Sequence, residues 1–214
     1  MTPEPPALGP DVFAGRRRRV VELLGDRAAA LFVAPPASVR SNDVEYPYRQ
    51  DNDLLYLTGL TEPGSAALLL PGHLDGEFHL FVRPRDPERE TWTGRRTGIE
   101  GARARFGADV AHDIGELAAT VTKLVAERER FYYTLGRDRH TNEQVLQWLQ
   151  QWHQGRPRLG CGPHALYDPT EIVHEMRLFK APAEVEMMRA AAAIAADAHV
   201  GAMRSVRPGM HEFE

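Results

Sequence analysis

The chain has 214 residues, of which 43% are hydrophobic, so it can bury a substantial core. Its 26 basic and 30 acidic residues leave a net charge of -4, which argues against a nucleic-acid-binding or membrane-surface protein. No stretch approaches the ~20 apolar residues of a membrane span. The single cysteine, Cys161, cannot form an internal disulfide, which favours a reducing compartment. We therefore expect a cytoplasmic protein that contacts neither nucleic acid nor membrane.

The start of the chain predicts a tail, a helix and a strand. Residues 1–10 contain four prolines and no apolar run, so we expect a disordered tail. Asp11 can cap a helix that runs to about Leu24, in which the consecutive Arg16 to Arg19 are interpreted as a solvated face. Ala28–Val33 is a short apolar run, typical of a buried strand.

The next segments predict a loop and a hairpin. Ser41–Asp53 is polar and aromatic, and Pro47 disfavours both a helix and an interior strand there. Ala66–Leu70 and Phe78–Val82 flank a turn rich in Gly, Asp and Pro, which indicates an antiparallel hairpin. The histidines beside this turn, His73 and His79, are expected at the surface.

Helices and strands then alternate. Asp113 is the expected N-cap of an amphipathic helix that ends near Arg128. A strand is predicted over Phe131–Leu135, and Thr141 with Gln144 predicts a capping box that opens another helix. This alternation indicates a layered α/β domain over residues 11–167.

The last part of the chain, residues 168–214, predicts a linker helix and the start of a further domain. Asp168 precedes Pro169, a proline suited to the first helical position. After a restart at Ala181-Pro182, an alanine-rich helix is expected to run from Ala183 to about Val206.

Catalytic motifs do not emerge from residue spacing. The sequence has no HExxH, no paired cysteines, no Gly-x-Ser-x-Gly and no phosphate-binding glycine loop after a predicted strand. His174 and Glu175 occupy adjacent helical positions that point to different faces, so a surface or salt-bridging role is favoured over metal binding. The residues alone predict an α/β module with no catalytic or metal-binding residue.

Three passages carry a resemblance to a known family. They are EYPYRQDNDLLYLTG (Glu45–Gly59), RPRDPERETWTGRR (Arg83–Arg96) and VHEMRLFKAPAE (Val173–Glu184). Together they resemble the N-terminal domain and linker of bacterial Xaa-Pro aminopeptidases, in the creatinase and prolidase superfamily. The resemblance covers nearly the whole chain from about residue 11.

The resemblance implies an N-terminal α/β domain with a mixed sheet flanked by helices, followed by a catalytic "pita-bread" domain. In the family that second domain holds two divalent ions, usually manganese, through two Asp, one His and two Glu, and it releases an N-terminal residue that precedes proline. None of these ligands matches a position here. We therefore expect a chain truncated before its catalytic domain, with no cofactor and no activity of its own, whose last long helix begins the missing domain.

The resemblance also implies one site residue and several partners. Trp92 matches a tryptophan that, in tetrameric relatives, reaches the substrate pocket of a neighbouring subunit; the alternative is a packed surface aromatic. The implied partners are the chain's own catalytic domain, neighbouring subunits of a homo-oligomer, and peptides with proline at the second position. Two other functions stay open, a stand-alone protein-interaction module of the same fold and a prolidase-type dipeptidase.

Overall fold

The computed structural model describes residues 8–214, so most of the expected tail over residues 1–10 lies outside the described part. Residues 10–176 form one compact unit, and a second unit contains residues 177–214. Among the described residues, no helix is both long enough and apolar enough to cross a membrane.

The first unit is built on a six-stranded mixed sheet. In spatial order its strands are β6 (Val110–Asp113), β5 (Phe78–Val82), β4 (Ala66–Leu69), β1 (Ala28–Val33), β7 (Arg130–Tyr132) and β8 (Ala165–Tyr167). β4 runs antiparallel to both neighbours, and the other pairs are parallel. The predicted mixed sheet and the hairpin of β4 and β5 are confirmed.

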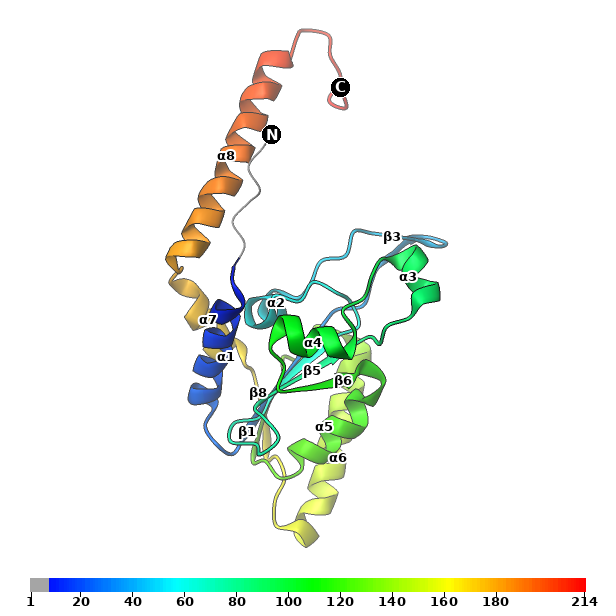
Figure 1. The fold of residues 1–214 in the computed structure, drawn as a ribbon, viewed down its shortest axis with the longest axis vertical. Helices are drawn as coiled ribbons and strands as arrows, with labels where there is room; N and C mark the ends of the chain where they lie inside the picture. Colours follow the sequence, from blue (N-terminus) through cyan, green and yellow to red (C-terminus); the bar gives the residue numbers. More distant parts are fainter. Residues whose placement is uncertain (1–7) are drawn as a thin grey trace. The chain divides into compact units, whose positions relative to one another are not determined.

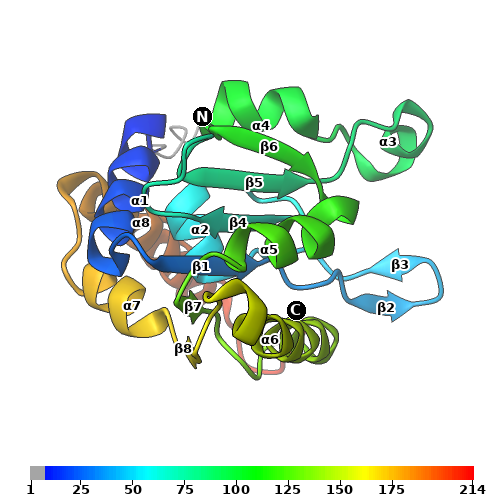
Figure 2. The ribbon, with the colours of Figure 1, turned by 90° about the horizontal axis from the view of Figure 1, so that it is seen from below.

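Helices cover both faces of this sheet (Figures 1 and 2). Side chains alternate between faces along a strand, so Ala28, Ala30 and Phe32 of β1 enter one core while Ala29 and Leu31 enter the other. The first core is closed by α1 (Pro10–Leu24), α2 (Asn52–Thr58), α4 (Gly98–Phe106) and α7 (Thr170–Leu178). The second is closed by α5 (Leu117–Val125) and α6 (Arg139–Leu159).

The strand directions gather several loops at one end of the sheet. Because only β4 is reversed, the carboxyl ends of β1, β5, β6, β7 and β8 lie at the same end. After β1 the chain forms a two-stranded hairpin, β2 (Val39–Ser41) with β3 (Val44–Glu45), and after β5 it forms α3 (Pro87–Thr93). Both project beyond this end of the sheet (Figure 2).

The solvated face expected for Arg16 to Arg19 is wrong for its first two members. Arg16 and Arg17 are buried and donate to Tyr56 O and Leu57 O, at 3.0 and 2.9 Å. These carbonyls belong to the last turn of α2, where intrahelical donors are lacking. Each guanidinium also lies on an aromatic ring, Arg16 on Tyr56 and Arg17 on Phe78. Burial lowers the pKa of Arg17 to about 10.

Several helix starts differ from the prediction. α6 is capped by Asp138, whose carboxylate accepts from Thr141 N at 2.7 Å, so Thr141 is inside the helix. Asp113 accepts from Gly115 N and opens a 3₁₀ turn, η1 (Ile114–Glu116), before α5 begins. The Asp168 carboxylate accepts from Thr170 N, as expected of a capping residue, although α7 begins at Thr170 and not at Pro169. α3, α4 and β6 were not predicted, because each is short and only weakly patterned.

In the second unit, α8 (Pro182–Ser205) begins where the proline restart predicts. Pro182 takes the first helical position, and the Glu184 carboxylate accepts from Ala181 N at 2.8 Å. α8 buries none of its residues.

His79 is not at the surface, contrary to the prediction. It is 2% exposed on β5, where its Nδ1 lies 3.0 Å from His112 Nε2 and its Nε2 lies 3.2 Å from Gly76 O. Burial, followed by the neighbouring His112, lowers the pKa of His79 to about 4, an effect that His73 supports and Asp109 opposes. The pKa of His112 is also lowered by burial, against the opposing charge of Glu116. Both imidazoles are therefore neutral in the folded protein near neutral pH.

We expect His79 to make the stability of the fold depend on pH. Its folded pKa lies below the value of 6.5 for an unperturbed histidine, so the unfolded chain binds the proton more readily. The free energy that neutral His79 adds to the stability of the fold is fully present above about pH 6.5. It declines as the pH falls toward 4. Urea unfolding at pH 7.5 and pH 5 should show a loss of about 1–2 kcal/mol that is attributable to this residue.

The variant His79→Gln should have a smaller difference in unfolding free energy between these two pH values than the wild type. His153→Gln, for which no contact with the buried pair exists among the described residues, is the control. Equal pH dependence in His79→Gln and the wild type would show that the buried imidazole does not control acid stability.

Candidate functional site

Trp92 lies on the short helix α3 and is 89% exposed. α3 begins with Pro87, is capped by Asp86 and buries none of its residues. Thr91 and Thr93 bond back to carbonyls one turn earlier, and the Glu90 carboxylate accepts from Arg85 Nε at 2.6 Å. This hydrogen bond lowers the pKa of Glu90. α3 therefore presents an aromatic ring to solvent and does not pack it.

The two ends of the segment that carries α3 are held together. Arg96 is buried, donates to Pro84 O at 3.3 Å and lies 4.0 Å from Asp86. The stem of Arg85 crosses Gly98, whose φ is +66° and where a Cβ would lie 2.6 Å from Arg85 Cγ. Gly98 is therefore required both for its backbone conformation and for this close approach. Residues 84–98 form a closed projection.

Glu62 anchors the end of this projection to the body of the domain. Its carboxylate accepts from Thr97 N at 2.9 Å and also from the Thr97 hydroxyl. The carbonyl of Glu62 in turn accepts from Gln50 Nε2 at 3.0 Å and from Ser65 Oγ at 2.9 Å. Gln50 Oε1 accepts from Tyr48 at 2.9 Å. Glu62 therefore links Gln50 of the first passage to Thr97, the residue that follows the second passage.

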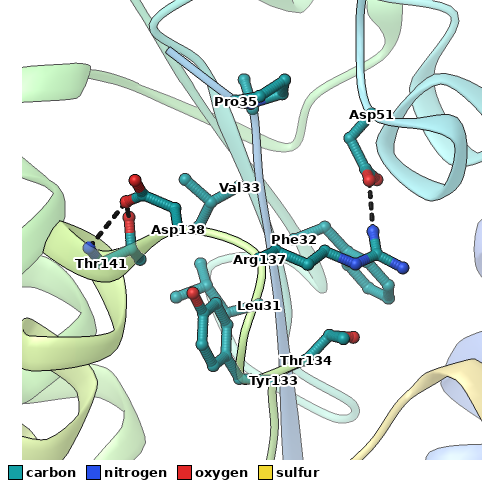
Figure 3. A pocket seen from close by; sticks show the side chains of 11 residues that line it. Leu31, Phe32, Val33, Pro35, Asp51, Tyr133, Thr134, Arg137, Asp138 and Thr141 are labelled. Atoms are coloured by element: carbon teal, nitrogen blue, oxygen red, sulfur yellow. Dashed lines mark hydrogen bonds and ion pairs between the residues drawn. The ribbon is translucent and has the colours of Figure 1, made fainter.

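A second network joins the first passage to the third. Arg137, in the loop after β7, pairs with Asp51 and with Asp53, the latter at 2.9 Å (Figure 3 shows the Asp51 pair). Asp51 also caps α2 by accepting from Asp53 N and Leu54 N. Asp53 is 2% exposed, and its other oxygen lies 3.3 Å from His174 Nε2 on α7. The His174 side chain is 54% exposed and contacts a carboxylate, as the predicted surface or salt-bridging role requires.

A small cavity lies beside this second network, between β1, Tyr133 and the start of α6 (Figure 3). Its volume is about 60 Å³, enough for a few water molecules but not for a peptide. The polar groups beside it are already bonded, Arg137 to Asp51 and Asp138 to Thr141. Hydrogen bonds from Thr141 lower the pKa of Asp138. This cavity is a structural feature of the domain and not a substrate site.

The metal that the family resemblance implies does not fit the residues described here. Among residues 8–214, no group of three or more His, Cys, Asp or Glu side chains is placed to hold a metal ion. Trp92 is thus the one residue that the sequence analysis singled out for a site, and the structure places it exposed on α3 within the projection. Sequence reasoning missed Glu62, because its partner Thr97 lies 35 residues away and no local pattern links them.

We expect Glu62→Ala to loosen the projection. The substitution leaves the partly buried Thr97 N–H and hydroxyl without their acceptor, which should cost about 1–3 kcal/mol. Hydrogen exchange should accelerate over residues 83–97 while β4 and β5 keep their protection. Glu22→Ala, which removes an exposed carboxylate paired with Arg19, should change neither property. Unchanged exchange at Thr97 in Glu62→Ala would contradict the anchoring role.

Comparisons with known proteins agree with this architecture. The chain is 37% identical to a Xaa-Pro aminopeptidase of Escherichia coli K12 over 203 residues, which are 94% of this chain and 46% of the relative. It is 29% identical to human Xaa-Pro aminopeptidase 3, covering 97% of this chain and 42% of that protein. The chain therefore spans about half the length of these relatives.

A solved structure of Pseudomonas aeruginosa aminopeptidase PepP matches with a TM-score of 0.91 and 37% identity, covering 97% of this chain and 47% of that one. Aminopeptidase P from E. coli matches with a TM-score of 0.89 and 35% identity, with 97% and 47% covered. The family model described as "Aminopeptidase P, N-terminal domain" matches residues 13–133. This chain belongs to the family of aminopeptidase P N-terminal domains.

Proposed function

We propose that this chain is the non-catalytic N-terminal half of a Xaa-Pro aminopeptidase, which removes an N-terminal residue that precedes proline. The observation that carries the proposal is the match to this domain across residues 13–133, together with relatives that are Xaa-Pro aminopeptidases. The described residues offer no group of side chains that could hold a metal ion. The two divalent ions of the complete enzyme would therefore be held by a domain outside this chain, and we propose that they are manganese.

In the complete protein, α8 would pack on that catalytic domain. α8 buries no residue, yet it carries several large apolar side chains in solvent: Met187, Met188, Ile194, Val200 and Met203. Exposed apolar surface of this extent is typical of an interface. We further propose a cytoplasmic homo-oligomer in which Trp92 reaches the substrate pocket of a neighbouring subunit. Trp92 is exposed, and hydrogen bonds from Arg96 to Pro84 and from Thr97 to Glu62 hold the segment that carries it. Both observations favour contact with a substrate over the role of a packed surface aromatic.

The isolated chain should not hydrolyse peptides. An assay would follow release of the N-terminal residue from a Xaa-Pro peptide with added manganese, comparing this chain with a protein extended through the natural downstream reading frame. We expect turnover only in the extended protein. Turnover by the pure isolated chain would overturn its non-catalytic role. If neither protein hydrolyses the peptide, a protein-interaction module is favoured. If cleavage is restricted to Xaa-Pro dipeptides, the extended protein is a prolidase.

In the active, extended protein, Trp92→Ala should lower kcat/KM for Xaa-Pro peptides about 3- to 10-fold, mainly through KM. This is the effect expected from losing one aromatic contact of about 0.5–1.5 kcal/mol with the substrate. The matched control is Leu74→Ala, which removes a fully exposed apolar side chain from the β4–β5 turn. Light scattering should show the same oligomer for both variants. Equal kinetics for Trp92→Ala and the wild type would exclude Trp92 from the substrate pocket.

A further inference from the structure

An arginine-lined cleft lies at the base of the α3 projection. Its volume is about 680 Å³, within the range of sites for small ligands. The charged residues that line it are four arginines and one glutamate: Arg85, Arg95, Arg96, Arg105 and Glu100. The excess of arginines gives the cleft a positive electrostatic potential, whereas the chain as a whole carries a net charge of -4. The cleft is therefore suited to an anion.

Two of these arginines have no acidic partner within the described part of the chain. Arg85 is paired with Glu90 at 2.6 Å, and Arg96 lies 4.0 Å from Asp86. Arg95 and Arg105 are exposed, and within residues 8–214 neither forms an ion pair. Arg105 lies 5.3 Å from the Phe106 ring, a contact that leaves its donors available. Two guanidinium groups thus remain to bind an incoming anion.

Arg96 adds a positive charge to the cleft wall. It is only 8% exposed, and its Nε, which has no hydrogen-bond acceptor among the described residues, is covered by protein atoms. The first turn of α4 lines the same cleft through Ile99, Glu100 and Gly101. Thr97 at the N-cap has helical backbone angles, and its side chain accepts no hydrogen bond from the first-turn N–H groups of α4. Unpaired donors of this kind call for an acceptor.

We propose that this cleft binds the C-terminal carboxylate of a short peptide. The proposal rests on the peptide-cleaving function proposed above. A carboxylate matches the planar fork of a guanidinium, and within the same segment Arg85 already binds the carboxylate of Glu90 through its Nε. Glu100 on the cleft wall favours this monoanion over the more highly charged phosphate.

The position of Trp92 supports a peptide as the source of this carboxylate. Trp92 precedes Arg95 by three residues, so their Cα atoms are at most ~11 Å apart. An extended peptide of two or three residues covers a similar distance. A peptide that contacts Trp92 can therefore place its terminal carboxylate between Arg95 and Arg105.

The test uses two probes, Ala-Pro-Ala-Ala with a free C-terminal carboxylate and the same peptide as its C-terminal amide. Each is titrated into the isotope-labelled 214-residue chain, and binding is followed by NMR at the amides of Ile99, Glu100 and Gly101. We expect the acid to bind about 5- to 10-fold more tightly than the amide. In the double variant Arg95→Gln and Arg105→Gln, this difference should disappear.

The matched control is Arg103→Gln with Arg18→Gln, which removes the same charge from exposed positions outside the cleft. It should keep the preference for the acid. Any of three results would overturn the proposal. They are equal binding of the acid and the amide, no binding of either peptide at millimolar concentration, and loss of the preference for the acid in the control variant. Inorganic phosphate that displaces the acid and binds more tightly would identify a phosphate site instead.

This binding test needs neither metal nor turnover. The carboxylate site and the proposed aminopeptidase function can therefore be refuted independently of each other. An active extended enzyme whose isolated N-terminal chain does not distinguish acid from amide would refute only the carboxylate site. A clear preference for the acid, combined with an inactive extended protein, would refute only the aminopeptidase function.

Discussion

The buried carboxylate of Asp53 is the constraint around which the first unit is assembled. A carboxylate that is 2% exposed is stable only if polar or charged partners replace the water it has lost, and the Arg137 guanidinium and the His174 imidazole supply these contacts. These partners come from the loop after β7 and from α7, so α2, the sheet and α7 must adopt one arrangement to satisfy it. The opposite end of α2 is fixed by Arg16 and Arg17 of α1. A seven-residue helix, too short to be stable alone, is thereby held at both ends.

Much of this fold could be predicted because its cues are local. The apolar runs of β1, β4 and β5 lie within a few residues of each other, and the helix starts at Asp168 and Pro182 follow from capping chemistry. The misassigned features depend on distant partners. Arg16 and Arg17 look like a surface run until α2, 40 residues away, supplies carbonyls to them. His79 looks like a turn residue until β6 brings His112 against it.

The site was less predictable than the fold. Trp92 was singled out only through the resemblance to a family, since neither its spacing nor its neighbours mark it in the sequence. Its exposure depends on α3 burying nothing, and its position depends on Glu62, Arg96 and Gly98. The arginine cleft likewise combines residues on both sides of α3 with Arg105 on α4. Such a surface exists only after the chain has folded.

The closed projection has a consequence for how this domain can change during evolution. Because α3 contributes no side chain to either core, substitutions at its exposed positions should affect folding little, whereas Glu90 is constrained by its bonds to Arg85 and Asp86. Changes at these exposed positions therefore alter the surface of α3, while the closure at Pro84, Arg96 and Thr97 separates them from the sheet. The 15 positions from Pro84 to Gly98 thus combine residues that fix the ends of the projection with a helix that presents its side chains to solvent.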